Sequence, residues 1–224
     1  MSERTDLMEK RILIIDLDGT IIDSRERHIS VMQDVLAGIK NNGFNGDEYM
    51  AFKSFGKSSR DYLEEVLHLD RDDAARAAAM WSAKIELSAY IHEDRLYEDA
   101  LPFLNSVYPL SGIIFLTARS NDLGLNTELR ALDLFPYPDA VIKADPMNAL
   151  EEKLKAVEAI RKAYEKAEIT IIGDTENEYE LAQKTGLKAY ILNRGFRCKE
   201  FWDARNVKSY GSLEEILKDK EAKI

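Results

Sequence analysis

The chain has 224 residues, of which 45% are hydrophobic and 32% charged, proportions typical of a globular protein with one domain or a core and an insert. With 31 basic and 41 acidic side chains its formal net charge is −10, which disfavours binding to a nucleic-acid polymer or an anionic membrane. A single cysteine excludes an internal disulfide, and no apolar run approaches the ~20 residues of a membrane span. The first residues lack a signal-peptide core, so we expect a cytoplasmic protein.

Short aliphatic runs recur along the chain and have the length and composition of buried strands. The first extends from Ile12 to Asp16, and later ones lie at 112–118, 139–143, 168–174 and 188–193. Such continuous runs are typical of strands covered on both faces. Helical patterns separate the later runs, and this alternation predicts an α/β domain with a parallel sheet.

The segment between the first two runs has a different pattern. From about Ser24 to Tyr97, apolar residues recur at helical spacing and no convincing strand is evident. The Ala-rich stretch from Asp72 to Ile91 predicts one longer helix. We therefore expect a core domain formed by residues 1–22 and 96–224, with residues 23–95 inserted as a helical domain.

The strongest chemical signal is the motif Asp16-Leu17-Asp18-Gly19-Thr20, which directly follows the first strand. In open α/β sheets the ligand crevice lies outside the carboxyl ends of the strands. Burying two neighbouring carboxylates is costly unless a cation or hydrogen bonds compensate. A strand that ends in a polar turn would show the same two acids, so the other strand ends decide between these interpretations.

Those strand ends carry complementary groups. Asp174 ends a second aliphatic run, and Thr117 ends a third, followed closely by Arg119. Hard carboxylate oxygens suit Mg²⁺, whereas a lysine and a hydroxyl suit the oxygens of a phosphate. Together with Asp16 and a lysine, these residues predict a site for Mg²⁺ and a phosphate.

Three lysines could complete the site. The sequence Asn148-Ala-Leu-Glu151 has the form of a capping box, so a helix is expected to start there. On that helix Lys153 lies beside the apolar stripe and near the strand ends, whereas Lys155 lies almost opposite the stripe. Lys143 directly follows a strand and stays an alternative, but we prefer Lys153.

In this order the motifs resemble those of the haloacid dehalogenase-like superfamily: Asp16 to Thr20, then Thr117, then a lysine, then Gly173-Asp174. The inserted helices are similar to the α-helical cap of the phosphoglycolate phosphatase and β-phosphoglucomutase type. The resemblance covers about residues 11 to 217. It implies a Rossmann-like parallel sheet sandwiched by helices, with a helical cap inserted after the first strand.

The resemblance also implies roles for the motif residues. Asp16 would attack phosphorus to form an aspartyl-phosphate, and Asp18 would act as general acid and then general base. Mg²⁺ would bind the carboxylates of Asp16 and Asp174 and the main-chain carbonyl of Asp18. Thr117 and the lysine would hold the phosphoryl oxygens. Because the chain keeps Asp18, a carbon–halogen substrate is not expected.

Other residues have weaker assignments. Glu178 stands where the superfamily usually has a second aspartate, and it would hold a metal-bound water or simply favour a helix N-terminus. In the cap, Lys57 and Arg60 resemble the segment that faces the substrate, although a solvated helix start has the same pattern. Arg119 is placed to reach the substrate or to form a surface ion pair. The histidines have no metal-ligand spacing and are expected to be surface or helix residues: His28, His68 and His92.

We therefore expect a Mg²⁺-dependent phosphatase that acts on a small phosphorylated metabolite. A β-phosphoglucomutase-like phosphotransferase would use the same nucleophile and is an alternative. A phosphonate hydrolase of the same superfamily would need a cap lysine that forms a Schiff base, for which Lys53 or Lys57 could be proposed. A non-catalytic binding protein with this fold is a further alternative, although such proteins usually lose the nucleophile or the acid/base, and this chain has both. The motifs identify neither the substrate nor the oligomeric state.

Overall fold

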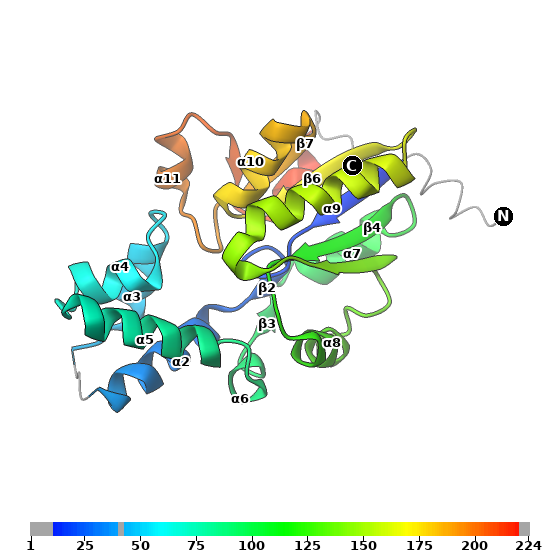
Figure 1. The fold of residues 1–224 in the computed structure, drawn as a ribbon. Coiled ribbons are helices and arrows are strands. Elements are labelled where there is room, and N and C mark those ends of the chain that lie inside the picture. Colours follow the sequence, from blue (N-terminus) through cyan, green and yellow to red (C-terminus); the bar gives the residue numbers. More distant parts are fainter. Residues whose placement is uncertain (1–10, 40–42, 220–224) are drawn as a thin grey trace.

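The computed structural model describes residues 11–39 and 43–219, which form an α/β core and a group of helices beside it (Figure 1). Residues 1–10 and 220–224 of the predicted core and residues 40–42 of the predicted cap lie outside the described residues. In the described part of the chain, no helix combines the length and the apolar character that a membrane span requires.

The core is built on one parallel sheet with the strand order β5-β4-β1-β6-β7-β8. Its central strand, β1 (Arg11–Ile15), pairs with β4 (Gly112–Thr117) and β6 (Glu168–Gly173). The outer strands are β5 (Ala140–Lys143) on one side and β7 (Lys188–Leu192) and β8 (Ser209–Tyr210) on the other. The predicted α/β fold with a parallel sheet is confirmed, although β8 is too short to give a sequence pattern.

Helices cover both faces of the sheet. Leu13 and Ile15 pack toward α7 (Ala100–Val107), α8 (Asp122–Ala131) and α12 (Leu213–Lys218). Ile12 and Ile14 pack on the opposite face against α9 (Ala149–Ala163) and α10 (Glu176–Thr185). Because successive strand residues point to opposite faces, double coverage explains why β1 is an uninterrupted aliphatic run.

The helices between β2 and β3 pack around a core of their own. They are α2 (Arg25–Gly38), α3 (Gly46–Lys53), α4 (Ser59–Glu65), α5 (Arg71–Lys84) and α6 (Ser88–Ile91). Their buried residues include Val31, Met32, Tyr49, Tyr62 and Leu63. We call this group the cap helices; two short antiparallel strands, β2 (Ile22–Asp23) and β3 (Arg95–Leu96), connect it to the core.

Three local expectations were wrong. The helix predicted from Asp72 to Ile91 is interrupted, because Glu86 turns its carboxylate toward the backbone N–H groups of Ser120 and Asn121 in the core. The helix α9 begins at Ala149, as the sequence predicted, but the Asn148 side chain makes no capping bond and a short 3₁₀ turn, η1 (Pro146–Asn148), precedes the helix. The last, β5, is an edge strand with exposed residues rather than a strand buried on both faces. One further helix of the core, the short α11 (Lys199–Asp203), follows β7.

Candidate active site

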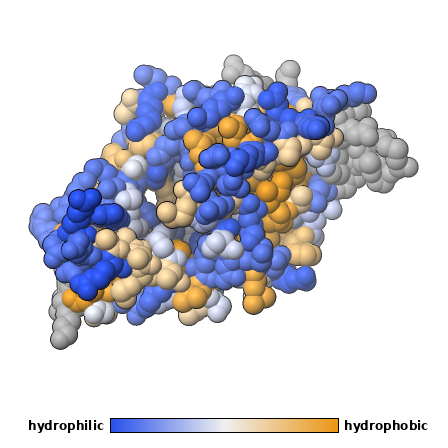
Figure 2. Space-filling view, in the orientation of Figure 1, coloured by the Kyte–Doolittle hydropathy of each residue, from blue (hydrophilic) through white to orange (hydrophobic). Residues whose placement is uncertain are grey.

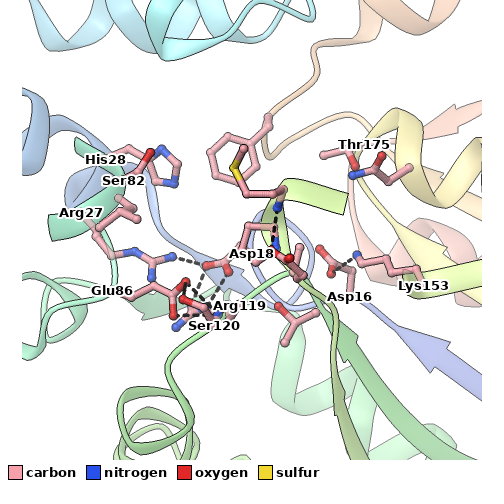
Figure 3. A pocket seen from close by; sticks show the side chains of 18 of the residues that line it. Asp16, Asp18, Arg27, His28, Ser82, Glu86, Arg119, Ser120, Lys153 and Thr175 are labelled. Carbon is pink, nitrogen blue, oxygen red and sulfur yellow. Dashed lines mark hydrogen bonds and ion pairs between the residues drawn. The ribbon is translucent and has the colours of Figure 1, made fainter. Parts of the chain in front are cut away.

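The carboxyl ends of the central strands bring the predicted motif residues together. Figure 3 labels Asp16, Asp18 and Lys153 among them. Asp16 follows β1, Asp174 follows β6, and Thr117 is the last residue of β4. From the first turns of α9, the Lys153 ammonium donates to Asp16 Oδ1 at 2.8 Å and to Glu178 Oε1 at 2.6 Å. Residues that are far apart in the sequence thus lie around the carboxylate of Asp16.

Lys143, the alternative lysine, lies elsewhere. Its ammonium donates to the backbone carbonyl of Ser120 at 3.1 Å and pairs with Asp122 at 2.6 Å. Between the two candidates, Lys153 is therefore the lysine that contacts the proposed nucleophile.

A buried group of three carboxylates could hold a cation. Asp16, Asp174 and Glu178 each offer an oxygen, and these atoms lie within 4.8 Å of one another. Burial, reinforced by Asp16, raises the pKa of Asp174 well above its usual value. Burial also raises the pKa of Asp16 to about 7, although the Lys153 ammonium opposes the shift. One lysine does not balance three carboxylates, and an oxygen-only ligand set fits Mg²⁺, so the residues fit this ion.

Two glycines allow the backbone to approach Asp174. Gly19 has a φ of 77°, and a Cβ there would lie 2.3 Å from Asp174 Oδ2. A Cβ on Gly195 would lie 2.2 Å from the same oxygen, which accepts the N–H of Phe196 at 2.5 Å. A larger residue at either position would displace the carboxylate from the site.

Glu178 both caps the start of α10 and belongs to the group of three carboxylates. Its Oε2 accepts the Thr175 hydroxyl at 2.7 Å and the Thr175 N–H at 3.2 Å, which closes a capping box at the start of α10. Burial favours the neutral acid, but Lys153 and Thr175 outweigh it and hold the pKa of Glu178 below its usual value. Glu178 is thus an ionised helix-start residue that also faces Asp16 and Asp174.

Asp18 is turned toward two arginines instead of toward Asp16. Arg119 Nε and Nη2 donate to the two Asp18 oxygens at 2.7 Å each, and Arg27 of α2 also contacts this carboxylate. Burial alone would raise the pKa of Asp18, but the two guanidinium groups hold it far below its usual range. In this arrangement Asp18 is an ionised carboxylate shared between a core arginine and a cap arginine.

A cavity of about 450 Å³ lies over these residues, between the core and the cap helices. The space-filling view shows the surface hollowed between the two parts, with hydrophilic residues on both sides (Figure 2). The core contributes Asp16, Asp18, Thr117 and Lys153 to the lining, and the cap helices contribute Arg27, His28, Trp81 and Ser82.

A family model described as haloacid dehalogenase-like hydrolase matches residues 10–186 of the 224-residue chain. The chain belongs to this family. The resemblance that the motif order indicated is therefore confirmed.

Solved structures with a similar fold cover nearly all of this hydrolase. A haloacid dehalogenase-like family hydrolase from Streptococcus pneumoniae has a TM-score of 0.74 and 16% identity, over 94% of this chain and 98% of that one. A predicted phosphatase from Clostridium acetobutylicum has a TM-score of 0.69 and 19% identity, over 93% and 97%. A predicted phosphoglycolate phosphatase from Haemophilus somnus has a TM-score of 0.69 and 14% identity, over 94% and 97%. None of the curated proteins matches the chain.

The weaker candidates of the hydrolase differ in position: Arg119 is buried beside Asp18, whereas Lys57 and Arg60 lie on the cap. Arg119 lines the cavity, but its guanidinium contacts Asp18 and the buried Glu128. Lys57 and Arg60 are half-exposed and pair with nearby glutamates of the cap. All three therefore have carboxylate partners in this arrangement.

Sequence reasoning assigned no functional role to Arg27 and His28 of the cap, and it considered Lys53 only as a Schiff-base lysine. His28 lies on a helix, as expected, but it is buried beside the rings of Trp81 and Phe196 rather than on the surface. Arg27 and Lys53 are also buried and charged. Their positions depend on how the cap helices pack together, and the only local signal was a charged residue on the apolar side of a helix.

Proposed function

We propose that this hydrolase is a phosphatase that cleaves a small-molecule phosphomonoester with the help of Mg²⁺. The observation that supports the proposal best is the environment of Asp16. Its carboxylate lies at the end of the central strand, 2.8 Å from Lys153 and beside the buried acids Asp174 and Glu178. A nucleophile next to a lysine and a cation site suits an incoming dianionic phosphate.

The proposed reaction has two displacements at phosphorus. In the first, an Asp16 oxygen bonds to phosphorus, the ester P–O bond breaks, and the leaving oxygen takes a proton from Asp18. In the second, water attacks the aspartyl-phosphate, gives a proton to Asp18 and releases phosphate and the Asp16 carboxylate. Lys153 and Thr117 would hold the phosphoryl oxygens throughout.

Mg²⁺ would be held by the carboxylates of Asp16 and Asp174 and the main-chain carbonyl of Asp18, with Glu178 in reach through a water. When bound it would offset the negative charge of the phosphoryl group and of the clustered acids. The ionised state of Glu178 and the glycine-lined approach to Asp174 are consistent with this assignment.

The proposal requires Asp18 to change partners. A carboxylate between two guanidinium groups binds a proton poorly, so it cannot act as an acid in the arrangement described. Arg119 belongs to the core and Arg27 to the cap helices, so a movement of the cap relative to the core would take Arg27 away from Asp18 but leave Arg119 beside it. We expect the substrate to draw the cap into a new position and its phosphoryl oxygens to compete for Arg119, so that the Asp18 carboxylate can turn toward the leaving oxygen.

The test is Mg²⁺-dependent hydrolysis of p-nitrophenyl phosphate by the wild type and by Asp16→Asn. Asparagine keeps the shape of the side chain but removes the anionic nucleophile, so we expect kcat to fall by roughly 10³-fold or more. An inactive wild type, or a variant with undiminished activity, contradicts the proposal. Turnover that requires a phosphorylated activator would point to a phosphotransferase instead.

A further inference from the structure

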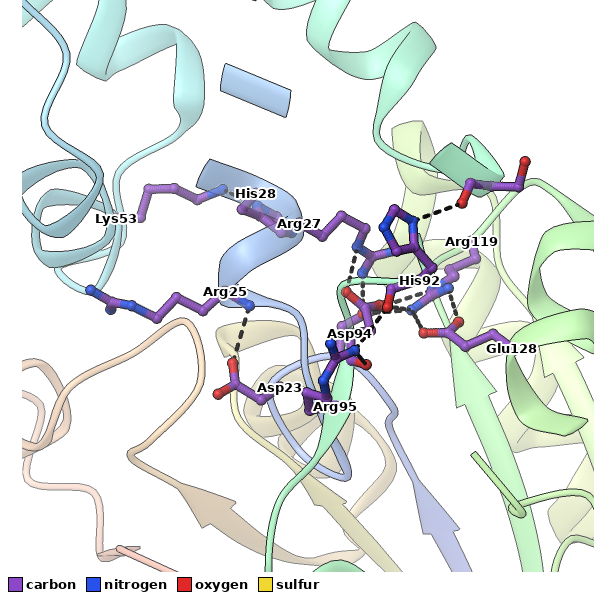
Figure 4. Close-up of polar contacts among 12 residues, drawn as sticks. Asp23, Arg25, Arg27, His28, Lys53, His92, Asp94, Arg95, Arg119 and Glu128 are labelled. Atoms are coloured by element: carbon purple, nitrogen blue, oxygen red, sulfur yellow. Dashed lines mark hydrogen bonds and ion pairs between the residues drawn. The ribbon is translucent and has the colours of Figure 1, made fainter. Parts of the chain in front are cut away.

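Lys53 is a buried lysine with an unusual set of neighbours. It ends α3, and only 8% of its surface is exposed. Its ammonium lies 3.0 Å from His28 Nδ1, 3.4 Å from Ser59 Oγ and 3.5 Å from Tyr49 Oη. Figure 4 shows Lys53 and His28 pointing toward each other from α3 and α2. Among the residues that the structure describes, no carboxylate pairs with Lys53.

Aromatic rings and cations complete this environment. The ammonium lies 5.0 Å from the ring centroid of Trp81 and 5.3 Å from that of Phe196. Burial, together with the charges of Arg197 and Arg27, lowers the pKa of Lys53 to about 7. A buried cation without a counterion is costly to keep, and an incoming anion would remove that cost.

The position of Lys53 connects it to the catalytic cavity. It lines a cavity of about 420 Å³ that also includes His28, Trp81, Ser82 and Phe196. These last four residues line the cavity above Asp16 as well. The two cavities therefore share lining residues, and Lys53 lies next to the cavity above Asp16.

We propose that Lys53 and His28 form a subsite for a second anionic group of the substrate. The substrate would then be a small phosphomonoester that also carries a carboxylate or a second phosphate. This inference rests on the proposed phosphatase function and adds the class of substrate. Lys57 and Arg60 are less suited to the role, because each is half-exposed and already paired with a glutamate.

The subsite would act on binding rather than on the reacting bonds. An ammonium group that contacts a non-reacting part of the substrate lowers KM, or raises kcat through the position it imposes. The net charge of −10 repels anions in general, so binding of a second anionic group would depend on local cations such as Lys53.

The test compares matched pairs of substrates. 2-Phosphoglycolate is paired with 2-hydroxyethyl phosphate, in which a neutral group replaces the carboxylate. Propane-1,3-diol bisphosphate is paired with its monophosphate, so the two pairs separate a carboxylate from a second phosphate. For the wild type we expect kcat/KM to favour the anionic member of at least one pair by roughly tenfold or more.

In Lys53→Met this preference should disappear, while Lys199→Met, a change of an exposed lysine on α11, should retain it. Calorimetric binding of the same pairs to Asp16→Asn gives a second measurement, which does not depend on whether Lys53→Met folds. An enzyme that hydrolyses p-nitrophenyl phosphate but shows no anion preference in either assay overturns the subsite alone. A wild-type protein that hydrolyses none of the tested substrates would instead overturn the proposed function.

Discussion

Replacing Lys53 with methionine should change how the stability of the protein depends on pH. The side chains have similar length, but methionine has no charge to bury. In the folded chain the pKa of Lys53 is lowered to about 7 from its ordinary value of 10.5, first by burial and then by two arginines. The folded protein therefore holds this proton less tightly than the unfolded chain.

The sign and size of the effect follow from proton linkage. Between pH 7 and 10.5, the two pKa values of Lys53, the unfolded chain binds a proton that the folded chain releases. The free energy of unfolding consequently rises with pH in this window, by at most ~1.4 kcal/mol per pH unit. At neutral pH the buried charge costs up to ~4 kcal/mol, an upper limit that the contacts with His28 and the aromatic rings reduce.

Urea unfolding of the wild type, Lys53→Met and Lys199→Met at several pH values between 7.5 and 10 would measure this slope. Phosphate should be absent from the buffer, because a bound anion would favour the protonated lysine. We expect a shallower slope for Lys53→Met and an unchanged slope for Lys199→Met, whatever packing energy the methionine gains or loses. If the free energy of unfolding depends on pH in the same way for the wild type and Lys53→Met, the pKa of Lys53 is not lowered in the folded protein and the reasoning is refuted.

Other changes probe the carboxylate cluster and the contact between cap and core. Glu178→Gln should weaken Mg²⁺ binding by about tenfold in a metal titration, and an unchanged affinity would exclude Glu178 from the ion's surroundings. Gly195→Ala would place a Cβ 2.2 Å from Asp174 Oδ2 and 2.4 Å from a backbone carbon, so we expect a loss of about 1–3 kcal/mol in urea unfolding. Glu86→Ala removes hydrogen bonds from cap to core and should speed proteolysis near β2 and β3; a cleavage rate equal to that of the wild type would contradict this expectation.

The residues that sequence analysis placed well are those fixed by strand ends. Asp16, Thr117 and Asp174 each end or follow an aliphatic run, and the parallel sheet brings such ends to one edge. Lys153 could be chosen because helical periodicity indicates which residues of the first turns face the sheet. For these residues, the sequence pattern that marks a strand end or a helix face also determines where the side chain lies in the fold.

The functional residues of the cap were harder to predict, because their positions depend on how the helices pack against one another and against the core. Lys53 and His28 lie on different helices, and nothing in the spacing of the sequence indicates that their nitrogens are 3.0 Å apart. The break between α5 and α6 likewise reflects Glu86, whose partners Ser120 and Asn121 belong to the core. Contacts of this kind leave no periodic signal in the sequence.

The loop between β1 and β2 ties the catalytic groups to the cap. Asp16 and Asp18 precede Ile22, the first residue of β2, by only a few positions. Backbone bonds from Gly19 N to Ile22 O at 2.7 Å and from Ile22 N to Leu17 O at 2.9 Å make this loop compact. If the cap rotates about β2 and β3, as the proposed function requires, this compact loop would move with it and change the position of Asp18 relative to Arg27. The motion that admits the substrate would then also remove one of the two guanidinium groups that keep Asp18 ionised.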